Sequence, residues 1–396
     1  MSTLFSIDID GEPGLKGYVS IHSTIQGRSY GGFRIASDLS SQSIVKAART
    51  MTLKHGFLGL PLGGSKAGIV ADPEMPLSEK NELLKSFGQS IKSLLQKREY
   101  VPSTDMGVTI DDIKYLLNSS GLRMSSRHIL PQASGFYAGL TVFTATVKAA
   151  NHIGLDLNNA SVAIEGFGSV GSSVALACWQ RGIKVVAVST SQGAIYCKKG
   201  LDIGELIQLY NEVGSQVTRL YQKGELMDDC KLSELDVDIF SPCAQPYSIT
   251  LDNVHKVTAK IISPGANIPL EDGASQILIQ KGTLAIPDFV ANCGGALATT
   301  MKRTGLKDSF ILHFIEHKFG QKVTDILRIA EEKGVPIEAY AELIAEEHFL
   351  RVKEAAENRT IRNKVFGFPL YLYRQGVIPY QLGAPLARIY FDRIFA

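Results

Sequence analysis

The chain has 396 residues, of which 45% are hydrophobic and 20% charged, and its formal net charge is +2. These proportions exclude a disordered or collagen-like chain, and the length predicts two or three domains. The balanced charge argues against nucleic acid or a membrane as a partner, and no apolar run reaches the ~18 residues of a membrane span. Five cysteines without CxxC spacing argue against a disulfide framework or a metal site, so we expect a cytoplasmic protein.

The N-terminal third mixes strand and helix patterns. Residues 15–22 have the partial alternation of a strand, and residues 41–55 have one apolar face at helical spacing, with Gly56 placed to end the helix. Residues 60–68 are rich in glycine and predict a loop. A second helix is predicted over 78–97.

The middle of the chain alternates short apolar runs with helical stretches. The runs are 162–165, 184–189, 237–240, 259–262 and 284–287. Runs at this spacing predict βαβ units and a parallel sheet. The last third is mainly helical, with an amphipathic helix predicted over 337–358.

A glycine-rich motif follows the first of these strands and opens a helix over 172–181. It has the GxGxxG form and consists of Gly166, Phe167, Gly168, Ser169, Val170 and Gly171. In this context the glycines permit a tight turn, a close backbone approach to a pyrophosphate and packing of helix on strand. The motif therefore predicts dinucleotide binding, and the alternative is a glycine-rich turn that binds nothing.

The acidic residue that usually binds the adenine ribose, about 20 residues after the motif, is missing. Ser189 and Thr190 end the second strand instead, and Lys198 and Lys199 are close in sequence. Two hydroxyls leave room for a 2′-phosphate, which favours NADP or use of both cofactors. The alternative is that the two lysines belong to a solvated loop.

Several short motifs occur in the order of one known family. They are Gly31-Gly32-Phe33-Arg34, Met51-Thr52-Leu53-Lys54, Leu62-Gly63-Gly64-Ser65-Lys66, Asp105-Met106-Gly107, Pro242-Cys243-Ala244, Gly265-Ala266-Asn267 and Asn292-Cys293-Gly294-Gly295. Together they resemble the Glu/Leu/Phe/Val amino-acid dehydrogenase family over about residues 14–300. The N-terminal part is closest to the leucine and phenylalanine branch.

The resemblance implies an α/β fold with two domains. A Rossmann-type, doubly wound dinucleotide-binding domain is expected over 134–334, and an α/β substrate domain over 1–133, rejoined by 335–396. The active site is expected in the cleft between them. The implied reaction is the NAD- or NADP-dependent oxidative deamination of an L-amino acid to a 2-oxo acid and ammonia, and its reverse, in a homo-oligomer.

The resemblance also implies roles for matching residues. Lys66 is expected to be the catalytic lysine, Asp105 the proton shuttle and Lys54 the partner of the substrate α-carboxylate. Other substrate-binding residues are expected to be Tyr30, Gly31, Gly32 and Thr299, and other cofactor-binding residues Ala244, Asn267 and Asn292. Taken alone, each has a plainer explanation: Lys54 as a helix-dipole partner, Lys66 as a surface lysine and Asp105 as a helix cap.

Some positions depart from the family pattern. Tyr30 stands where glutamate dehydrogenases carry a lysine for the side-chain carboxylate, so we expect an apolar or aromatic substrate. The family's threonine near the nicotinamide is replaced by Ser134 or Thr141, Tyr247 replaces an asparagine, and Pro264 replaces a glutamate. Two alternatives therefore stay open: a glutamate dehydrogenase with atypical recognition, or a catalytically impaired homologue acting as a sensor or assembly partner.

The C-terminal segment 366–396 is rich in aromatic residues. Two interpretations are open: the aromatic side chains pack over the first domain, or they form a contact between subunits.

Overall fold

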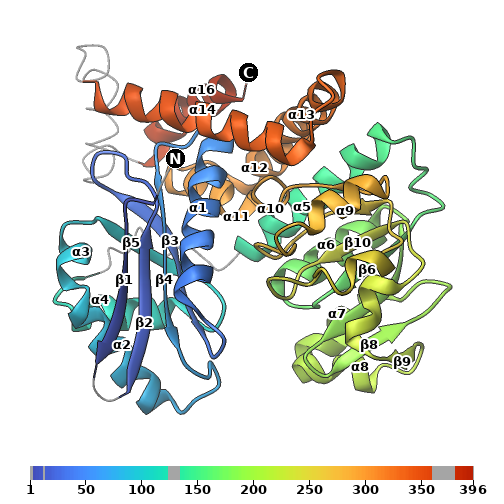
Figure 1. Ribbon diagram of the computed structural model, residues 1–396, viewed down its shortest axis with the longest axis horizontal. Coiled ribbons are helices and arrows are strands. Elements are labelled where there is room, and N and C mark those ends of the chain that lie inside the picture. The colour runs from blue at the N-terminus through green and yellow to red at the C-terminus, as the bar shows by residue number, and fades with distance from the viewer. Residues whose placement is uncertain (1–2, 12–13, 124–133, 359–379, 396) are drawn as a thin grey trace. The chain divides into compact units, whose positions relative to one another are not determined.

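The computed structural model describes residues 3–11, 14–123, 134–358 and 380–395 (Figure 1). The chain divides into two compact units. The first comprises Met1–Pro131 and Leu343–Leu386, and the second Gln132–Glu342 and Ala387–Ala396. Residues 335–342 and 387–396 thus group with the second unit, whereas the sequence places them with the first. Among the described residues, no helix is both long enough and apolar enough to cross a bilayer.

A five-stranded sheet with the order β1-β2-β4-β3-β5 forms the centre of the first unit (Figure 1). Its strands are β1 (Phe5–Gly11), β2 (Leu15–Ile21), β3 (Ser29–Ala36), β4 (Gly63–Val70) and β5 (Tyr100–Thr104). β3, β4 and β5 run parallel, whereas β2 pairs antiparallel with both of its neighbours, β4 and β1. The helices are α1 (Ser41–Phe57), α2 (Leu77–Ser90), α3 (Lys92–Gln96), α4 (Ile110–Ser119) and the larger part of α14 (Ile337–Glu357).

The two faces of this sheet differ in character because alternate residues of a strand point to opposite faces. One face carries an apolar core, in which Phe33 and Ala67 lie with Phe87 of α2 and Leu116 of α4. The rings of Phe33 and Phe87 are 5.0 Å apart. The other face, under α1, carries polar residues and is the face that holds the candidate site.

The prediction of a glycine-rich loop over 60–68 is wrong, because β4 occupies most of it and lies inside the sheet. A Cβ on Gly64 would lie 2.3 Å from the backbone nitrogen of Thr52 on α1, and one on Gly63 would lie 2.3 Å from the carbonyl of Ser23. These glycines let neighbouring backbone pack closely on the strand and do not mark a turn.

Two helix boundaries also differ from the sequence prediction. The helix expected over 78–97 is two helices, α2 and α3, that meet at Ile91. Gly56 does not end α1, which continues to Phe57. A Cβ on Gly56 would lie 2.1 Å from the carbonyl oxygen of Ala345, so this glycine lets α14 pack closely against α1.

The second unit is built on a seven-stranded sheet with the order β12-β11-β10-β6-β7-β8-β9. Its strands are β6 (Ser161–Glu165), β7 (Lys184–Thr190), β8 (Gly193–Tyr196), β9 (Glu225–Met227), β10 (Ile239–Pro242), β11 (Ile261–Ile262) and β12 (Leu284–Ala285). Five neighbouring strands run parallel, namely β12, β11, β10, β6 and β7. The predicted parallel sheet is therefore confirmed. The antiparallel strands β8 and β9 at one edge are an addition that the sequence reading missed.

Helices pack on this sheet and on one another, and the described part of the last third of the chain is mainly helical, as predicted. They are α5 (Ser134–His152), α6 (Ser169–Gln180), α7 (Ile203–Val213), α8 (Val217–Leu220), α9 (Ala274–Gln280), α10 (Asp288–Ala291), α11 (Gly294–Arg303), α12 (Asp308–Phe314), α13 (Gly320–Glu332) and the end of α16 (Tyr380–Ile394).

The aromatic C-terminal segment is described only from residue 380, so the aromatic residues of 366–379 lie outside the described residues. In α16, Phe391 is buried, and its ring is 6.1 Å from that of Phe314. Phe395 lies 4.8 Å from the same ring. These two aromatics therefore pack within the second unit, and not over the first domain as one interpretation expected.

Candidate active site

Three charged residues come together on the α1 face of the first sheet. Lys66 lies on β4, Arg34 on the neighbouring β3, and Asp105 directly after β5. Because β3 and β5 are parallel with Phe33 opposite Thr104, Asp105 lies beside Arg34. The parallel register of β3 and β4 brings Lys66 to the same place on the sheet.

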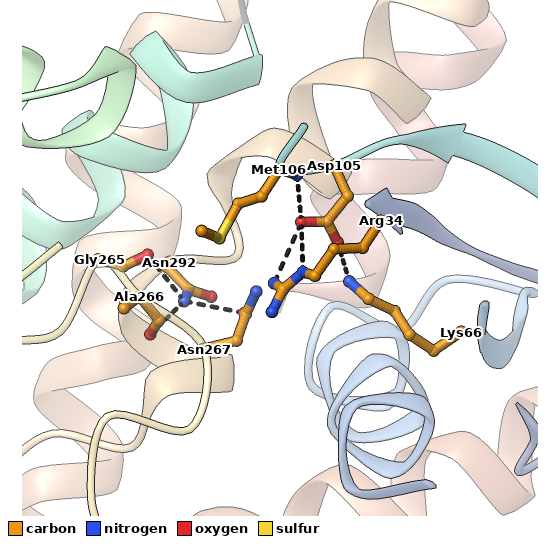
Figure 2. Close-up of polar contacts among 8 residues, drawn as sticks. All are labelled: Arg34, Lys66, Asp105, Met106, Gly265, Ala266, Asn267 and Asn292. Atoms are coloured by element: carbon orange, nitrogen blue, oxygen red, sulfur yellow. Dashed lines mark hydrogen bonds and ion pairs between the residues drawn. The ribbon is translucent and has the colours of Figure 1, made fainter. Parts of the chain in front are cut away.

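The Asp105 carboxylate has different partners on its two oxygens (Figure 2). Its Oδ1 accepts hydrogen bonds from Nη2 of Arg34 at 3.1 Å, Nε of Arg34 at 3.4 Å and the backbone N–H of Met106 at 2.7 Å. Its Oδ2 accepts from Nζ of Lys66. The side chains of Lys66, Arg34 and Asp105 are 4%, 11% and 13% exposed, so water screens their charges weakly.

Burial lowers the pKa of Lys66 well below its usual value, and the neighbouring cations Arg34 and Lys54 lower it further. Asp105 acts in the opposite direction, because a carboxylate favours the ammonium form. The Asp105 charge is shared between Lys66 and Arg34, so burial and the two cations determine the direction in which the pKa of Lys66 shifts. Lys66 therefore loses its proton more readily than an ordinary lysine, as a general base must.

Lys54 lies in the last turn of α1 and is buried. The next residue, His55, donates from Nδ1 to the carbonyl of Gly63 at 3.2 Å. Burial, and then Lys54, lower the pKa of His55 to about 4, so this imidazole is neutral at pH 7. The positive charge of Lys54 therefore lowers the pKa of both His55 and Lys66.

Glycines make room for this cluster. A Cβ on Gly32 would lie 2.5 Å from Oδ2 of Asp105, and one on Gly31 would lie 1.6 Å from the carbonyl of Ser65. Gly32 thus borders the reactive carboxylate, whereas Gly31 packs against β4. Tyr30 is half-buried on β3 and has the same side-chain parity as Gly32 and Arg34.

The sequence reading missed Arg34 as a site residue, although it quoted the motif that contains it. The signal available was its spacing, because Arg34 lies two residues after Gly32 and so points to the same face of β3.

The sequence reading also missed a group of polar residues that supports β4. Oγ1 of Thr52 lies 2.9 Å from Nδ1 of His22 and 2.6 Å from Oγ of Ser23, and Ser23 accepts from the N–H of Gly64 at 2.9 Å.

In the second unit, Gly166 to Gly171 form the turn between β6 and α6. Gly166 has a φ of +88°, and a Cβ on it would lie 2.9 Å from Cα of Ala244, so both the turn and Ala244 require glycine there. A Cβ on Gly171 would lie 1.8 Å from the carbonyl of Gly166. Gly168 is exposed with open space around its Cβ position, and it precedes the free N–H groups of α6.

This turn fits a dinucleotide. The open space at Gly168 admits a pyrophosphate, and the N-terminus of the twelve-residue α6 offers the N–H groups and dipole that bind it. Phe167 is buried with its ring 5.6 Å from Tyr210, whereas Ser169 is exposed and Val170 half-buried. Phe167 therefore packs inside the second unit, and its role in cofactor binding stays a prediction.

The contacts of Ser189 and Thr190 alter the ribose argument. Ser189 accepts from the N–H of Gly166 at 2.9 Å, and Thr190 donates to the carbonyl of Ser215 at 2.6 Å. Both hydroxyls thus hold the protein itself together.

The two lysines lie elsewhere. β8 runs antiparallel to β7, so Lys198 and Lys199 return to the start of β7, at the opposite end of that strand from Ser189. Lys199 lines a cavity of about 380 Å³ there with Trp179 and Lys184. The expectation that these lysines accompany Ser189 at a 2′-phosphate is wrong, because the antiparallel strand carries them away.

A loop held in a strained conformation contains Asn267. The side-chain nitrogen of Asn292 donates to the carbonyls of Gly265 and Ala266 at 3.2 and 3.0 Å and to Oδ1 of Asn267 at 3.1 Å (Figure 2). Ile268 has a φ of +54°, which a β-branched residue rarely adopts. The Oδ1 of Asn292 is buried without a hydrogen-bond partner, so an acceptor is available there to a ligand.

Apart from Tyr30, the residues that depart from the family pattern all lie in the second unit. Tyr247 has a φ of +57°, its N–H donates to the carbonyl of Ile268 at 2.8 Å, and Pro264 is buried at the start of the Asn267 loop. Thr141 is buried, donating to the carbonyl of Ala138 and accepting from the N–H of Gly294, so it is an internal structural residue. Ser134 is exposed at the start of α5.

Glycine contacts join Ser134 to the cofactor turn. A Cβ on Gly135 would lie 2.0 Å from Oγ of Ser169, and one on Gly295 would lie 3.1 Å from the carbonyl of Ser134. Of the two candidates near the nicotinamide, Ser134 therefore lies beside the turn. Thr299 is half-buried on α11.

Both units of the chain match models of one protein family. Residues 2–120 match the family described as Glu/Leu/Phe/Val dehydrogenase, dimerisation domain, and residues 133–360 match Glutamate/Leucine/Phenylalanine/Valine dehydrogenase. A glutamate dehydrogenase of Thermotoga maritima is 31% identical, with 87% of this chain and 86% of that protein covered. An NAD-specific glutamate dehydrogenase of Staphylococcus aureus is 33% identical, with 70% of each covered.

The solved structures agree. The hetero-hexameric glutamate dehydrogenase of Thermus thermophilus, in its leucine-bound form, superimposes with a TM-score of 0.74 at 25% identity, covering 88% of this chain and 87% of that chain. A buried low-pKa lysine paired with a carboxylate, a Rossmann-type turn, and family matches over both units support one conclusion. The chain belongs to the Glu/Leu/Phe/Val dehydrogenase family and is an amino-acid dehydrogenase.

Proposed function

We propose that the protein catalyses the oxidative deamination of an L-amino acid to a 2-oxo acid and ammonia, and the reverse reductive amination, with NAD or NADP. The observation that carries this proposal is the Lys66–Asp105 pair, flanked by Arg34 and Lys54 in a buried site. When bound, the nicotinamide dinucleotide supplies the acceptor for the hydride that leaves the α-carbon. The fit of the turn at Gly166–Gly171 to a pyrophosphate supports its binding in the second unit.

The residues of the first unit then take distinct roles. Lys54 binds the α-carboxylate of the substrate, because a buried cation favours an anionic partner. Lys66 in its neutral form accepts a proton from the water that attacks the iminium carbon and, as an ammonium, stabilises the developing charge. Asp105 exchanges protons with the amino group that leaves as ammonia.

In the second unit, the backbone N–H groups of α6 bind the pyrophosphate. Ala244, Asn267 and Asn292 would hold the rest of the dinucleotide, and the unpartnered Oδ1 of Asn292 would accept a hydrogen bond there.

We further propose an apolar or aromatic substrate side chain. Tyr30 provides no cation, and a side-chain carboxylate buried without one is costly. Glutamate is the second candidate, because the relatives from Thermotoga maritima and Staphylococcus aureus are glutamate dehydrogenases.

An amino-acid panel tests both proposals. Absorbance at 340 nm is followed with NAD and with NADP for glutamate, leucine, valine, phenylalanine and tryptophan. Leucine or an aromatic amino acid is expected to exceed glutamate in kcat/KM. Faster turnover of glutamate would contradict the substrate proposal, and a flat trace throughout would contradict the reaction. Cofactor binding by calorimetry without turnover would instead identify a catalytically impaired homologue.

We also propose that the protein assembles as a homo-oligomer. The match of residues 2–120 to a domain described as a dimerisation domain supports this. Light scattering coupled to size exclusion tests the assembly, and a mass of about 43 kDa, that of one chain, would contradict it. The cytoplasmic location stays a prediction.

A further inference from the structure

We propose that Arg34 is a positioning residue for this reaction: it fixes Oδ1 of Asp105, so that Oδ2 alone exchanges protons with Lys66 and the substrate. The inference rests on the proposed function, because it assumes that Asp105 moves a proton. It adds a residue to the site that the family resemblance did not assign a role.

The hydrogen bonds of Asp105 carry the argument. Oδ1 accepts from two nitrogens of Arg34, at 3.1 and 3.4 Å, and from the N–H of Met106 at 2.7 Å, whereas Oδ2 faces Lys66. An oxygen that already accepts three hydrogen bonds, two of them from a cationic guanidinium, is a poor proton acceptor. Arg34 cannot take the proton of Asp105 either, since a guanidinium stays charged in proteins. The proton is therefore confined to the Oδ2 side.

Gly32 leaves this oxygen accessible. A side chain at position 32 would lie 2.5 Å from Oδ2, so a substrate amino group can approach Oδ2 only because the residue is glycine. Two nitrogens of Arg34 hold Oδ1 in one position, which a single lysine nitrogen does not do. Orientation matters because a displacement of about 1 Å in a catalytic group costs on the order of 100-fold in rate.

The charged and titratable groups around Lys66 come from every neighbouring element. α1 contributes Lys54 and His55, β3 contributes Arg34, and Asp105 follows β5. His22, directly after β2, has its Nδ1 beside Thr52, and Asp38 after β3 acts on Arg34. Among these, Arg34 and Lys54 lower the pKa of Lys66, after burial. Removing the Arg34 cation therefore raises the pKa of Lys66.

The test compares Arg34→Met and Arg34→Lys with the wild type, using the amino acid that the panel identifies. Arg49→Met is the matched control, because Arg49 lies in the same unit with a 40% exposed side chain that pairs with Glu346 at 3.7 Å. Arg34→Met is expected to lower the maximal kcat by about 100-fold and to shift the acid limb of the kcat profile upward by about one pH unit. Arg34→Lys keeps the charge, so its limb stays within about 0.3 units of wild type while kcat falls about 10-fold.

Three outcomes would overturn the proposal. One is a kcat for Arg34→Met within threefold of wild type. Another is full recovery of kcat in Arg34→Lys, which would mean that charge alone suffices. The third is a rise in KM with kcat unchanged, which would make Arg34 a substrate-binding residue. Circular dichroism melting of each variant excludes loss of fold as the cause.

A second readout does not need turnover. Cyanate carbamylates neutral amines, so the rate of Lys66 modification at increasing pH, followed by peptide mass spectrometry, reports its pKa. Arg34→Met is expected to require a higher pH for the same rate, and Arg49→Met is not. If wild type shows no turnover but this shift is present, the proposed reaction fails and the coupling of Arg34 to Lys66 stands. If the profiles coincide, that coupling fails whatever the activity.

Discussion

Two buried lysine–aspartate pairs belong to the first unit, one on each side of its sheet. Lys66 and Asp105 lie on the α1 face, and Lys80 of α2 pairs with Asp112 of α4 at 2.8 Å on the apolar side. Their exposures are similar, with Lys80 and Asp112 side chains 11% and 6% exposed. Burial and ion pairing therefore do not by themselves distinguish a reactive lysine from a structural one.

The surroundings distinguish them. Asp112 accepts from the N–H of Thr109 at 2.7 Å in the capping box of α4, so this pair joins two helices and closes a helix end. Asp105 is shared between Lys66 and Arg34, with Lys54 acting on Lys66 as well. Cations gathered around one carboxylate favour an incoming anion, whereas a matched pair does not.

The largest expected effect is on activity. Lys66→Met is expected to lower kcat/KM by about 10³-fold or more, because the proposed general base is removed. Asp105 keeps Arg34 and the N–H of Met106 as partners, so the fold is expected to survive. Steady-state assays and thermal melting measure the two effects. Residual activity above about one tenth of wild type would place the catalytic base elsewhere.

Lys80→Met should give the reverse pattern. Removing one partner of a buried pair leaves Asp112 with a single capping bond, which costs about 3 kcal/mol of stability. Urea unfolding measures this loss, and kcat of the folded enzyme is expected to stay within about twofold. A drop in kcat comparable to that of Lys66→Met would remove the contrast between the two pairs.

An effect confined to acidic pH, and absent at neutral pH, is expected from His55 on the α1 face. Its pKa of about 4 lies below the usual 6.5, so the unfolded state binds the proton more readily. Stability is therefore full above pH 6.5 and falls as the pH decreases toward 4, by about 3 kcal/mol over this window. Urea unfolding of wild type and His55→Asn across pH 4–7.5 checks this. Equal slopes for the two proteins would mean that His55 does not titrate in this way.

Local features were predictable from sequence. The turn at Gly166–Gly171 depends on a strand, a turn and a helix that are adjacent along the chain, and the structure contains all three. The amphipathic pattern over 337–358 likewise predicted α14 to within a residue. In both cases the periodicity of nearby residues contains the information.

Features that depend on distant residues were not predictable. Arg34 meets Asp105 only through the register of β3 and β5, which no local pattern specifies. Lys199 is carried away from Ser189 by β8, an antiparallel strand in a sheet predicted to be parallel. The glycines of β4 suggested a loop because close packing against Thr52, which explains them, requires the tertiary fold.

The packing of α14 on α1 at Gly56 has a consequence for biosynthesis. Ala345 and Phe349 press on the helix that carries Lys54, and they are translated long after it. A nascent chain that has completed the five strands still lacks this support. The ribosome must therefore release the chain as far as Phe349 before the lysine-bearing helix is fully packed, and a product terminated before Ala345 would lack this contact.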